Sequence, residues 1–418
     1  MKTYLFIALA LCSSLAFAQQ EYKCDFEGVR SVKVPVYPDS PDSKQFDYRY
    51  QVIGNLDPEK IVIINLPGGP GGSSMNDFSI PQVKNRAIRG GLPENIPWIM
   101  IDPRTSGCNR ATVEEMPDDS LNSTNLAHDV LSVIESLKLK KYIIHGHSYG
   151  TQHATFVAGL AKQRGLPAPH ALFLSGILGR GEKDGSFSIP NNLILEWNLI
   201  KATLSPKAQA ILNSPLPLGY EDWEWESFIS SGLYSGYELY EGKYKNFFIE
   251  LLALVDEDDA TKREALHKEL RHEEYTRYGY SHTSRRLYAK VDCHEFSPDD
   301  GSTLFVNGSL VFDAEENPCK DEPFDRPYDS ADFEIESPIY YLAGTNDPAA
   351  PYKGAVYHFD NQVHAKRNFI TVNGGGHMKL GFVLGDCREG IWNAILQQKN
   401  LDDVIPNCKA DVKLEIRD

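Results

Sequence analysis

The sequence has a marked shortage of positive charge. Its 42 lysines and arginines stand against 58 aspartates and glutamates, which gives a net charge of −16. A surface that binds nucleic acid needs an excess of basic residues, so this composition argues against nucleic acid as a partner. Beyond its first residues the sequence also lacks an apolar run long enough to cross a membrane, and it contains no internal repeat. With 418 residues, 41% of them hydrophobic, it can form one large α/β domain with an insertion, or two domains.

Cysteine is scarce, and no Cys-x-x-Cys pair occurs among the seven cysteines, so a zinc site is not predicted. The N-terminus carries Lys2, an apolar stretch from Tyr4 to Leu11, and a small-x-small sequence that ends at Ala18. This pattern predicts a secretory signal peptide over residues 1–18, cleaved after about Ala18, and hence a secreted or periplasmic protein. The bulky Leu11 before Cys12 disfavours a lipid anchor at that cysteine.

Six cysteines remain after this cleavage, and an even number in an exported chain favours disulfides. Six cysteines allow fifteen pairings, and the sequence alone does not choose among them. Proximity along the chain suggests two pairs and leaves a third: Cys293–Cys319, Cys387–Cys408 and Cys24–Cys108.

Apolar runs of strand length alternate with helical patterns in two parts of the chain. This alternation predicts a doubly wound, mostly parallel sheet, with a core formed by residues 19–180 and 336–418. Between these parts, residues 181–335 are aromatic, acidic and mostly helical in pattern, which predicts an inserted, mainly helical cap domain. Strands are expected at 32–36, 46–53, 61–66, 98–102, 141–145, 171–174, 338–343 and 368–372, and helices at 123–137 and 388–398.

The pentapeptide Gly-His-Ser-Tyr-Gly at residues 146–150 lies between a predicted strand and a predicted helix. A strand, a sharp turn with a serine at its apex, and a helix form the nucleophile elbow of an α/β-hydrolase fold. Glycines flank the serine because a Cβ at either position would collide with the neighbouring strand or helix. Ser148 is therefore the expected nucleophile, and His147 beside it is expected to point away from the site as a packing residue.

A serine hydroxyl needs a base within hydrogen-bond reach, and that base needs an orienting acid. In this fold the three residues follow one another as serine, acid and histidine. Asp347 comes just after the strand at 338–343, and His377 follows the strand at 368–372 behind three glycines. We therefore expect Asp347 as the acid and His377 as the base, in a reaction that needs no metal and no cofactor. His358 and His364 are weaker candidates for the base, because both fall in a helical stretch.

Acyl transfer also needs donors for the oxyanion. The backbone N–H of Tyr149, directly after the nucleophile, is one expected donor. The second should come from the loop after the third strand, whose residues 67–73 read Pro-Gly-Gly-Pro-Gly-Gly-Ser. We expect Gly69 to supply it, with Gly68 as the next candidate. A phosphate-binding loop is disfavoured because the lysine of a Walker motif is missing.

These motifs together resemble a known family. Residues 68–71 (Gly-Gly-Pro-Gly) resemble the His-Gly-Gly-Pro-Gly motif of proline iminopeptidases, and Pro67 at the histidine position is closer to the related tripeptidyl aminopeptidases. Residues 102–107 (Asp-Pro-Arg-Thr-Ser-Gly) resemble the family's Asp-x-Arg-Gly-x-Gly, with Thr105 in place of a glycine. Residues 146–151 resemble its Gly-x-Ser-Tyr-Gly-Thr, and Asp347 and His377 match the remaining triad positions.

The resemblance implies release of N-terminal residues or short peptides, with cap carboxylates binding the cationic α-amino group. Residues 220–226 resemble the iminopeptidase Trp-x-x-Trp-Glu element, which makes Glu224 the first candidate for this role and Glu226 the second. Glu295 is a third, because Cys293-His294-Glu295 resembles a Cys-x-acidic element of the tripeptidyl branch. Acidic residues on a helical cap also commonly form a solvated face, and this alternative stays open.

The sequence thus predicts an exported serine aminopeptidase that acts on small peptides through Ser148, His377 and Asp347. A carboxylesterase or lactonase with the same triad is the main alternative, in which the cap carboxylates would be incidental. A non-catalytic binding protein on the same scaffold is a second alternative, but binding alone requires no triad in this order.

Overall fold

The computed structural model describes most of the chain, and the predicted signal peptide at residues 1–18 lies outside the described part. Glu224 and Glu226 also lie outside it. The described residues are 24–89, 92–110, 116–183, 188–214, 229–230, 232–240, 243–259, 261–262, 284–298, 302–306, 309–313, 317–378, 380–410 and 413–417.

A nine-stranded sheet forms the centre of the structure, in the order β1-β2-β4-β3-β5-β6-β11-β12-β13. The strands from β4 to β12 in this order are parallel, whereas β1, β2 and β13 pair antiparallel at the edges. The predicted strands are all present and β13 is an addition. Their bounds are β1 (Val29–Pro35), β2 (Gln45–Ile53), β3 (Ile61–Leu66), β4 (Trp98–Ile101), β5 (Lys141–His147), β6 (Ala171–Ser175), β11 (Ile339–Gly344), β12 (Arg367–Val372) and β13 (Leu414–Arg417).

Helices cover both faces of this sheet, which is why its central strands are apolar on both sides. Along β3, Val62 and Ile64 join one buried cluster with α2, α3 and α10, while Ile63 joins the opposite cluster with α1 and α11. The helices are α1 (Pro81–Arg89), α2 (Ser123–Ser136), α3 (Tyr149–Gln163), α10 (Tyr352–Asn361) and α11 (Cys387–Leu396), with short turns η2 (Asp118–Ser120), η6 (Ser330–Asp332) and η7 (Ile405–Asn407). Strand order and helical layers together give the α/β-hydrolase fold, as predicted.

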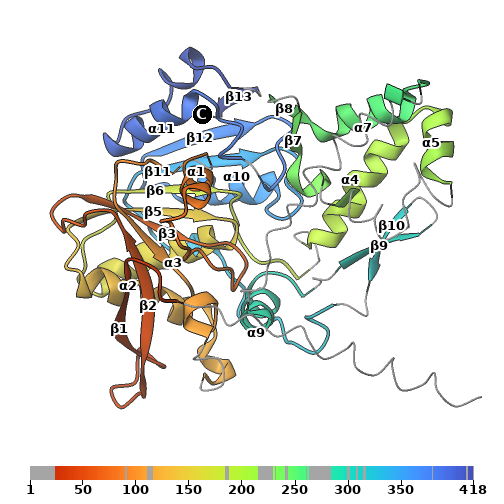
Figure 1. Ribbon diagram of the computed structural model, residues 1–418. Helices are drawn as coiled ribbons and strands as arrows, with labels where there is room; N and C mark the ends of the chain where they lie inside the picture. Colours follow the sequence, from red (N-terminus) through yellow and green to blue (C-terminus); the bar gives the residue numbers. More distant parts are fainter. Residues whose placement is uncertain are drawn as a thin grey trace, which may run out of the picture.

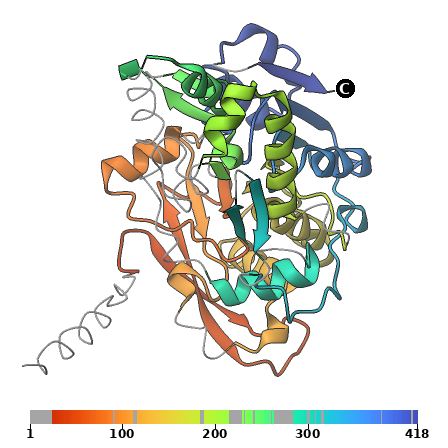
Figure 2. The same ribbon diagram turned by 90° about the vertical axis from the view of Figure 1, so that its right-hand side faces the viewer.

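The chain between β6 and β11 leaves the sheet and forms elements of its own, drawn in green and teal beside the sheet in Figure 1 and in front of it in Figure 2. Its described helices are α4 (Ile189–Thr203), α5 (Pro206–Leu212), α7 (Phe247–Asp256), α9 (Arg285–Tyr288) and the π-helical turn η5 (Ala289–Cys293). Helices α4, α5 and α7 share a small buried cluster around Trp197, Leu251 and Leu254, whereas Leu287 of α9 and Val291 of η5 belong to the main core of the sheet. Two antiparallel pairs accompany them, which the helical pattern of the sequence did not indicate: β7 (Tyr237–Tyr240) with β8 (Lys243–Asn246), and β9 (Ser302–Val306) with β10 (Ser309–Asp313).

All six described cysteines are paired, as proximity along the chain suggested: Cys24–Cys108, Cys293–Cys319 and Cys387–Cys408. Three disulfides are consistent with an oxidising, extracytoplasmic compartment. Within the described ranges, no helix has both the length and the apolar character needed to cross a membrane.

Candidate functional site

Ser148 sits at the sharp turn between β5 and α3, with φ of 58° and ψ of −130°. A side chain rarely adopts this left-handed backbone, so the turn needs support from its neighbours. A Cβ on Gly146 would lie 2.3 Å from the carbonyl oxygen of Gly150, and a Cβ on Gly150 would lie 2.4 Å from that of Leu66. The strand, turn and helix predicted around Ser148 are therefore present, and both glycines have the steric reason that the sequence suggested.

Asp347 and His377 meet at the ends of β11 and β12. Nδ1 of His377 donates to the Asp347 carboxylate, at 2.8 Å from Oδ2 and 3.0 Å from Oδ1. Oδ1 also accepts hydrogen bonds from the backbone N–H groups of Ala349 and Ala350, at 2.9 and 2.7 Å, which fix the carboxylate. Both side chains are almost fully buried, and Nε2 of His377 makes no hydrogen bond within the described residues. This nitrogen is thus the one left for a proton acceptor role.

The residues at the end of β6 contact both Ser148 and the imidazole of His377. The carbonyl oxygen of Ser175 accepts from the Ser148 backbone N–H at 2.9 Å. The next residue, Gly176, has φ of +59°, and a Cβ there would lie 3.0 Å from Cε1 of His377 and 3.4 Å from Oδ2 of Asp347. Ser175 therefore supports the serine turn, and Gly176 gives the imidazole room to approach.

His147 contacts the site, contrary to the expectation that it points away. Its ring centroid lies 4.9 Å from that of His377, with an angle of 33° between the planes. Its Nδ1 lies 3.0 Å from the Ser175 hydroxyl. Burial lowers the pKa of His147 to about 3, helped by the nearby His377 and His145, so His147 is a neutral ring packed against the imidazole of His377. The expected packing role is therefore present, but the ring packs against His377 and does not point elsewhere.

The glycine-rich loop after β3 passes beside Ser148. A Cβ on Gly68 would lie 3.1 Å from the Ser148 Cβ and 3.6 Å from its Oγ. Gly69 adopts φ of +126°, a conformation that favours glycine, and the backbone N–H of Gly72 closes the loop onto the carbonyl oxygen of Gly68 at 3.1 Å. On the other side, the N–H of Tyr149 belongs to the first turn of α3, where backbone N–H groups lack intrahelical acceptors. The loop that contains Gly69 therefore lies beside Ser148 through Gly68, the next candidate, and Tyr149 follows Ser148 directly in the chain.

The insertion contacts all three loops that carry these groups, which sequence reasoning did not anticipate because the contacts involve backbone atoms of distant segments. The hydrogen bonds between the insertion and these loops include His377 N–H to Tyr234 O at 2.7 Å, Ser284 N–H to Gly71 O at 3.1 Å, and Asn192 Nδ2 to Pro348 O at 3.0 Å. The site is therefore assembled from the sheet and from the insertion together.

Glu295 is the one described member of the three carboxylates proposed for an amino group. It is buried between α2 and α3, and burial raises its pKa. Its Oε1 accepts from the Ser123 backbone N–H at 3.0 Å, and its Oε2 accepts from Gln152 Nε2 at 2.8 Å. Both oxygens are therefore already engaged by the protein, which favours a structural role for this residue.

Glu196, on α4, is a further carboxylate at the site that sequence reasoning missed. Its pKa is raised to about 8, chiefly by burial and also by the Asp347 carboxylate, while the hydrogen bond from Asn346 opposes the shift. The amphipathic pattern of α4 is the one sequence signal that could have indicated a buried residue at Glu196. That pattern does not show that the helix lies beside the loop of Asp347.

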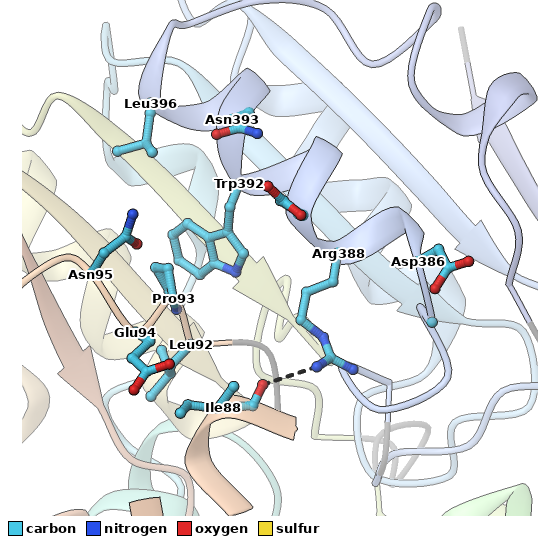
Figure 3. Close-up of a pocket in the computed structure, with 12 residues that line it drawn as sticks. Ile88, Leu92, Pro93, Glu94, Asn95, Asp386, Arg388, Trp392, Asn393 and Leu396 are labelled. Carbon is cyan, nitrogen blue, oxygen red and sulfur yellow. Dashed lines mark hydrogen bonds between the residues drawn. The ribbon is translucent and has the colours of Figure 1, made fainter. Parts of the chain in front are cut away.

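A cavity of about 670 Å³ lies elsewhere, between the end of α1, the segment before β4 and α11 (Figure 3). Trp392 and Leu92 line its apolar part, and Arg388 spans it to donate to the Ile88 carbonyl at 2.9 Å. Neither Ser148 nor His377 lines this cavity, so it is separate from the arrangement described above.

The sequence matches no protein-family model and no curated protein. Solved structures similar to it include a proline iminopeptidase from Mycobacterium smegmatis, at 14% identity and a TM-score of 0.43 over 88% of this chain and 98% of that one. An esterase from Rhodococcus has 13% identity and a TM-score of 0.44 over 88% and 98%. An esterase from Exiguobacterium antarcticum has 15% identity and a TM-score of 0.41 over 84% and 96%. Strand order, and not these distant likenesses, defines the fold.

Proposed function

We propose that this protein is a serine hydrolase with Ser148 as nucleophile. His377 Nε2 takes the proton of the Ser148 hydroxyl as its oxygen attacks a substrate carbonyl, and Asp347 holds the imidazole in the required tautomer. The N–H groups of Gly69 and Tyr149 stabilise the oxyanion of the tetrahedral intermediate. His377 then returns the proton to the leaving group, and water releases the acyl group from Ser148 by the same steps. The buried His377–Asp347 pair with an unbonded Nε2 is the observation that carries this proposal.

For the substrate we propose the N-terminal part of a short peptide, released by an exported aminopeptidase. The glycine-loop, Asp-x-Arg and serine-elbow motifs support this choice through their resemblance to iminopeptidases and tripeptidyl aminopeptidases. A cationic α-amino group needs a carboxylate partner, and Glu224 and Glu226 are our candidates for it. Glu295 is a poorer one, because Ser123 and Gln152 already occupy its oxygens.

An esterase or lactonase is the second candidate, and the engagement of Glu295 favours it. If no carboxylate is available for an amino group, the same triad would act on an ester without regard to a free amine.

Labelling by a serine-directed fluorophosphonate tests the mechanism. Wild type should be labelled and Ser148→Ala should not, with a loss of hydrolysis of about 10⁴-fold or more. Ser132→Ala, on α2, is the matched control and should label like wild type. Absence of labelling in folded wild type would refute the hydrolase proposal.

Paired substrates then separate the two substrate classes. An aminopeptidase should cleave a free aminoacyl p-nitroanilide far faster than its N-acetylated form. Equal rates on the two, together with rapid cleavage of a simple p-nitrophenyl ester, would rule out the aminopeptidase and support the esterase.

A further inference from the structure

Asp102 lies directly after β4, and its buried carboxylate accepts several hydrogen bonds from the end of the glycine-rich loop. Its Oδ1 accepts from the Ser73 hydroxyl at 2.9 Å and from the backbone N–H groups of Ser74 and Met75 at 2.7 and 3.1 Å. Its Oδ2 accepts from the backbone N–H of Cys108 at 2.9 Å. Three consecutive residues at the downstream end of the loop are therefore fixed to a single side chain.

The loop needs such a fixed point because of its composition. Four of the six residues from Pro67 to Gly72 are glycines, which lose more conformational freedom on ordering than any other residue. Its upstream end is held by the pairing of β3 with its neighbours, and the Gly72 N–H bond to Gly68 is internal to the loop. The carboxylate of Asp102 thus ties three backbone and side-chain donors of the downstream end to the end of β4, alongside the Ser74 hydroxyl, which donates to the Ile101 carbonyl at 2.6 Å.

The environment of Asp102 makes its hydrogen bonds to the loop depend on whether the carboxylate is ionised. The side chain is fully buried, and burial raises its pKa to about 6 although the hydrogen bonds from Cys108, Met75, Ser74 and Ser73 oppose the shift. Arg104 lies two residues away, but its guanidinium is directed to Asp129. From β2, the buried Tyr48 phenol faces the same region. No described cation forms an ion pair with Asp102, so its negative charge is stabilised by hydrogen bonds alone.

We propose that Asp102 is a positioning residue that holds the glycine-rich loop, and with it the Gly69 N–H, against Ser148. This inference rests on the proposed function for its catalytic consequence, but the anchoring itself does not. Ionised Asp102 accepts all four hydrogen bonds. A proton on Oδ2 removes the acceptor of the Cys108 N–H, and the neutral carboxyl holds the three loop donors at Oδ1 less strongly because these hydrogen bonds are no longer charge-assisted. The oxyanion donor should therefore become less well placed as Asp102 takes up a proton.

Asp102→Asn in the full chain tests this, with Asp329→Asn as the matched control. Asp329 likewise accepts hydrogen bonds from a backbone N–H and from a side-chain hydroxyl, that of Tyr357. We expect Asp102→Asn to lower kcat on a p-nitrophenyl ester about 10²-fold with KM unchanged, as for a displaced oxyanion donor. The acid limb of kcat should contain a contribution from the ionisation of Asp102 in wild type that is missing in Asp102→Asn. Asp329→Asn should keep the wild-type rate and profile.

Hydrogen exchange at pH 7 supplies a readout that does not need activity. The amides of Ser74 and Met75 should exchange at least about tenfold faster in Asp102→Asn, with α2 unchanged. If Asp102→Asn fails to fold, Ser73→Ala takes its place, because it deletes the hydroxyl that donates to Asp102. Its control is Ser120→Ala, which deletes a hydroxyl that donates to the Pro117 backbone carbonyl. Ser73→Ala should lower kcat several-fold and speed exchange of the same amides.

The proposal would be overturned if folded Asp102→Asn showed the same amide exchange at Ser74 and Met75, the same kcat and the same pH profile as wild type. If wild type is neither labelled by the fluorophosphonate nor active, the proposed function fails. The exchange result then decides separately whether Asp102 anchors the loop.

Discussion

The backbone N–H of His377 donates to the carbonyl oxygen of Tyr234 at 2.7 Å, and the Tyr234 ring packs edge-on against the imidazole at a centroid distance of 5.0 Å. Tyr234 belongs to the insertion, whereas His377 follows the last parallel strand of the sheet. The imidazole is therefore held from two sides, by Asp347 on its Nδ1 and by the insertion on its backbone and ring face. Geometry within about an ångström matters for proton transfer, so this contact couples the insertion to the proposed chemistry.

The substitution Gly376→Ala should break the contact between His377 and Tyr234. A Cβ on Gly376 would lie 2.6 Å from the Tyr234 carbonyl oxygen and 2.6 Å from the Ser235 carbonyl carbon, so the loop has to shift. We expect kcat on a p-nitrophenyl ester to fall about 10²-fold, as for a catalytic group displaced by about 1 Å. Gly165→Ala is the control, because a Cβ there meets nothing within 4 Å and only the positive φ is strained. Equal kcat values for the two variants would show that the Tyr234 contact does not position the base.

The sequence was sufficient for the sheet because its parallel strands are buried on both faces. The run at Ile339–Gly344 is apolar throughout, and the run at Ile61–Leu66 is apolar except for Asn65. Runs of this length between helical patterns are typical of the buried strands of a parallel sheet. β13 was missed because Leu414–Arg417 alternates apolar and charged residues over only four positions at a sheet edge. The hairpins of the insertion were missed for a similar reason. Their strands are too short for the alternation of apolar and polar residues to be distinguished from a helical pattern.

At the site, chain order and glycine placement indicated Ser148, Asp347 and His377, because each follows a strand that periodicity reveals. Contacts between distant segments could not be predicted in this way. The Asp-x-Arg motif marked Asp102, but nothing in the sequence says that its carboxylate receives the loop at Ser73. Likewise the position of Tyr234 depends on how the insertion packs, and local patterns do not determine that.

Asp347→Asn should keep the fold and remove most of the activity. An asparagine can still accept from the Ala349 and Ala350 N–H groups, but it can present its amide to His377 Nδ1 and favour the wrong imidazole tautomer. We expect kcat to fall about 10⁴-fold with KM little changed. Asp360→Asn, at an exposed position on α10, should be indistinguishable from wild type. A rate for Asp347→Asn within tenfold of wild type would be incompatible with the proposed triad.

Arg104 and Asp129 form a fully buried ion pair that should matter for stability. Arg104 donates to both carboxylate oxygens at 2.8 and 2.7 Å, and also to the Val36 carbonyl at 2.9 Å. Asp129→Asn leaves the buried guanidinium without its countercharge, so we expect a loss of about 3–5 kcal/mol in the free energy of unfolding.

Urea denaturation with the disulfides intact measures this loss. The exposed pair Lys33–Asp47 is the control, and Asp47→Asn should cost less than about 1 kcal/mol. The double variant Arg104→Met/Asp129→Leu should lose less stability than Asp129→Asn, because no uncompensated charge stays buried. A double variant at least as unstable as Asp129→Asn would mean that the cost comes from packing and not from charge.

Glu196 should make stability fall as pH rises. Its pKa is raised from 4.5 to about 8, chiefly by burial, so between these values the folded state holds a proton that the unfolded state has released. The favourable contribution is complete below pH 4.5 and lost as pH rises through 8. Glu196→Gln removes this titration, so its stability relative to wild type should increase steadily from pH 4.5 to 8 and then level off. Urea denaturation at half-unit pH intervals measures the difference, with the exposed Glu59→Gln as control. A pH-independent difference would show that Glu196 is ionised in the folded protein throughout this range, and that α4 leaves it open to water beside Asp347.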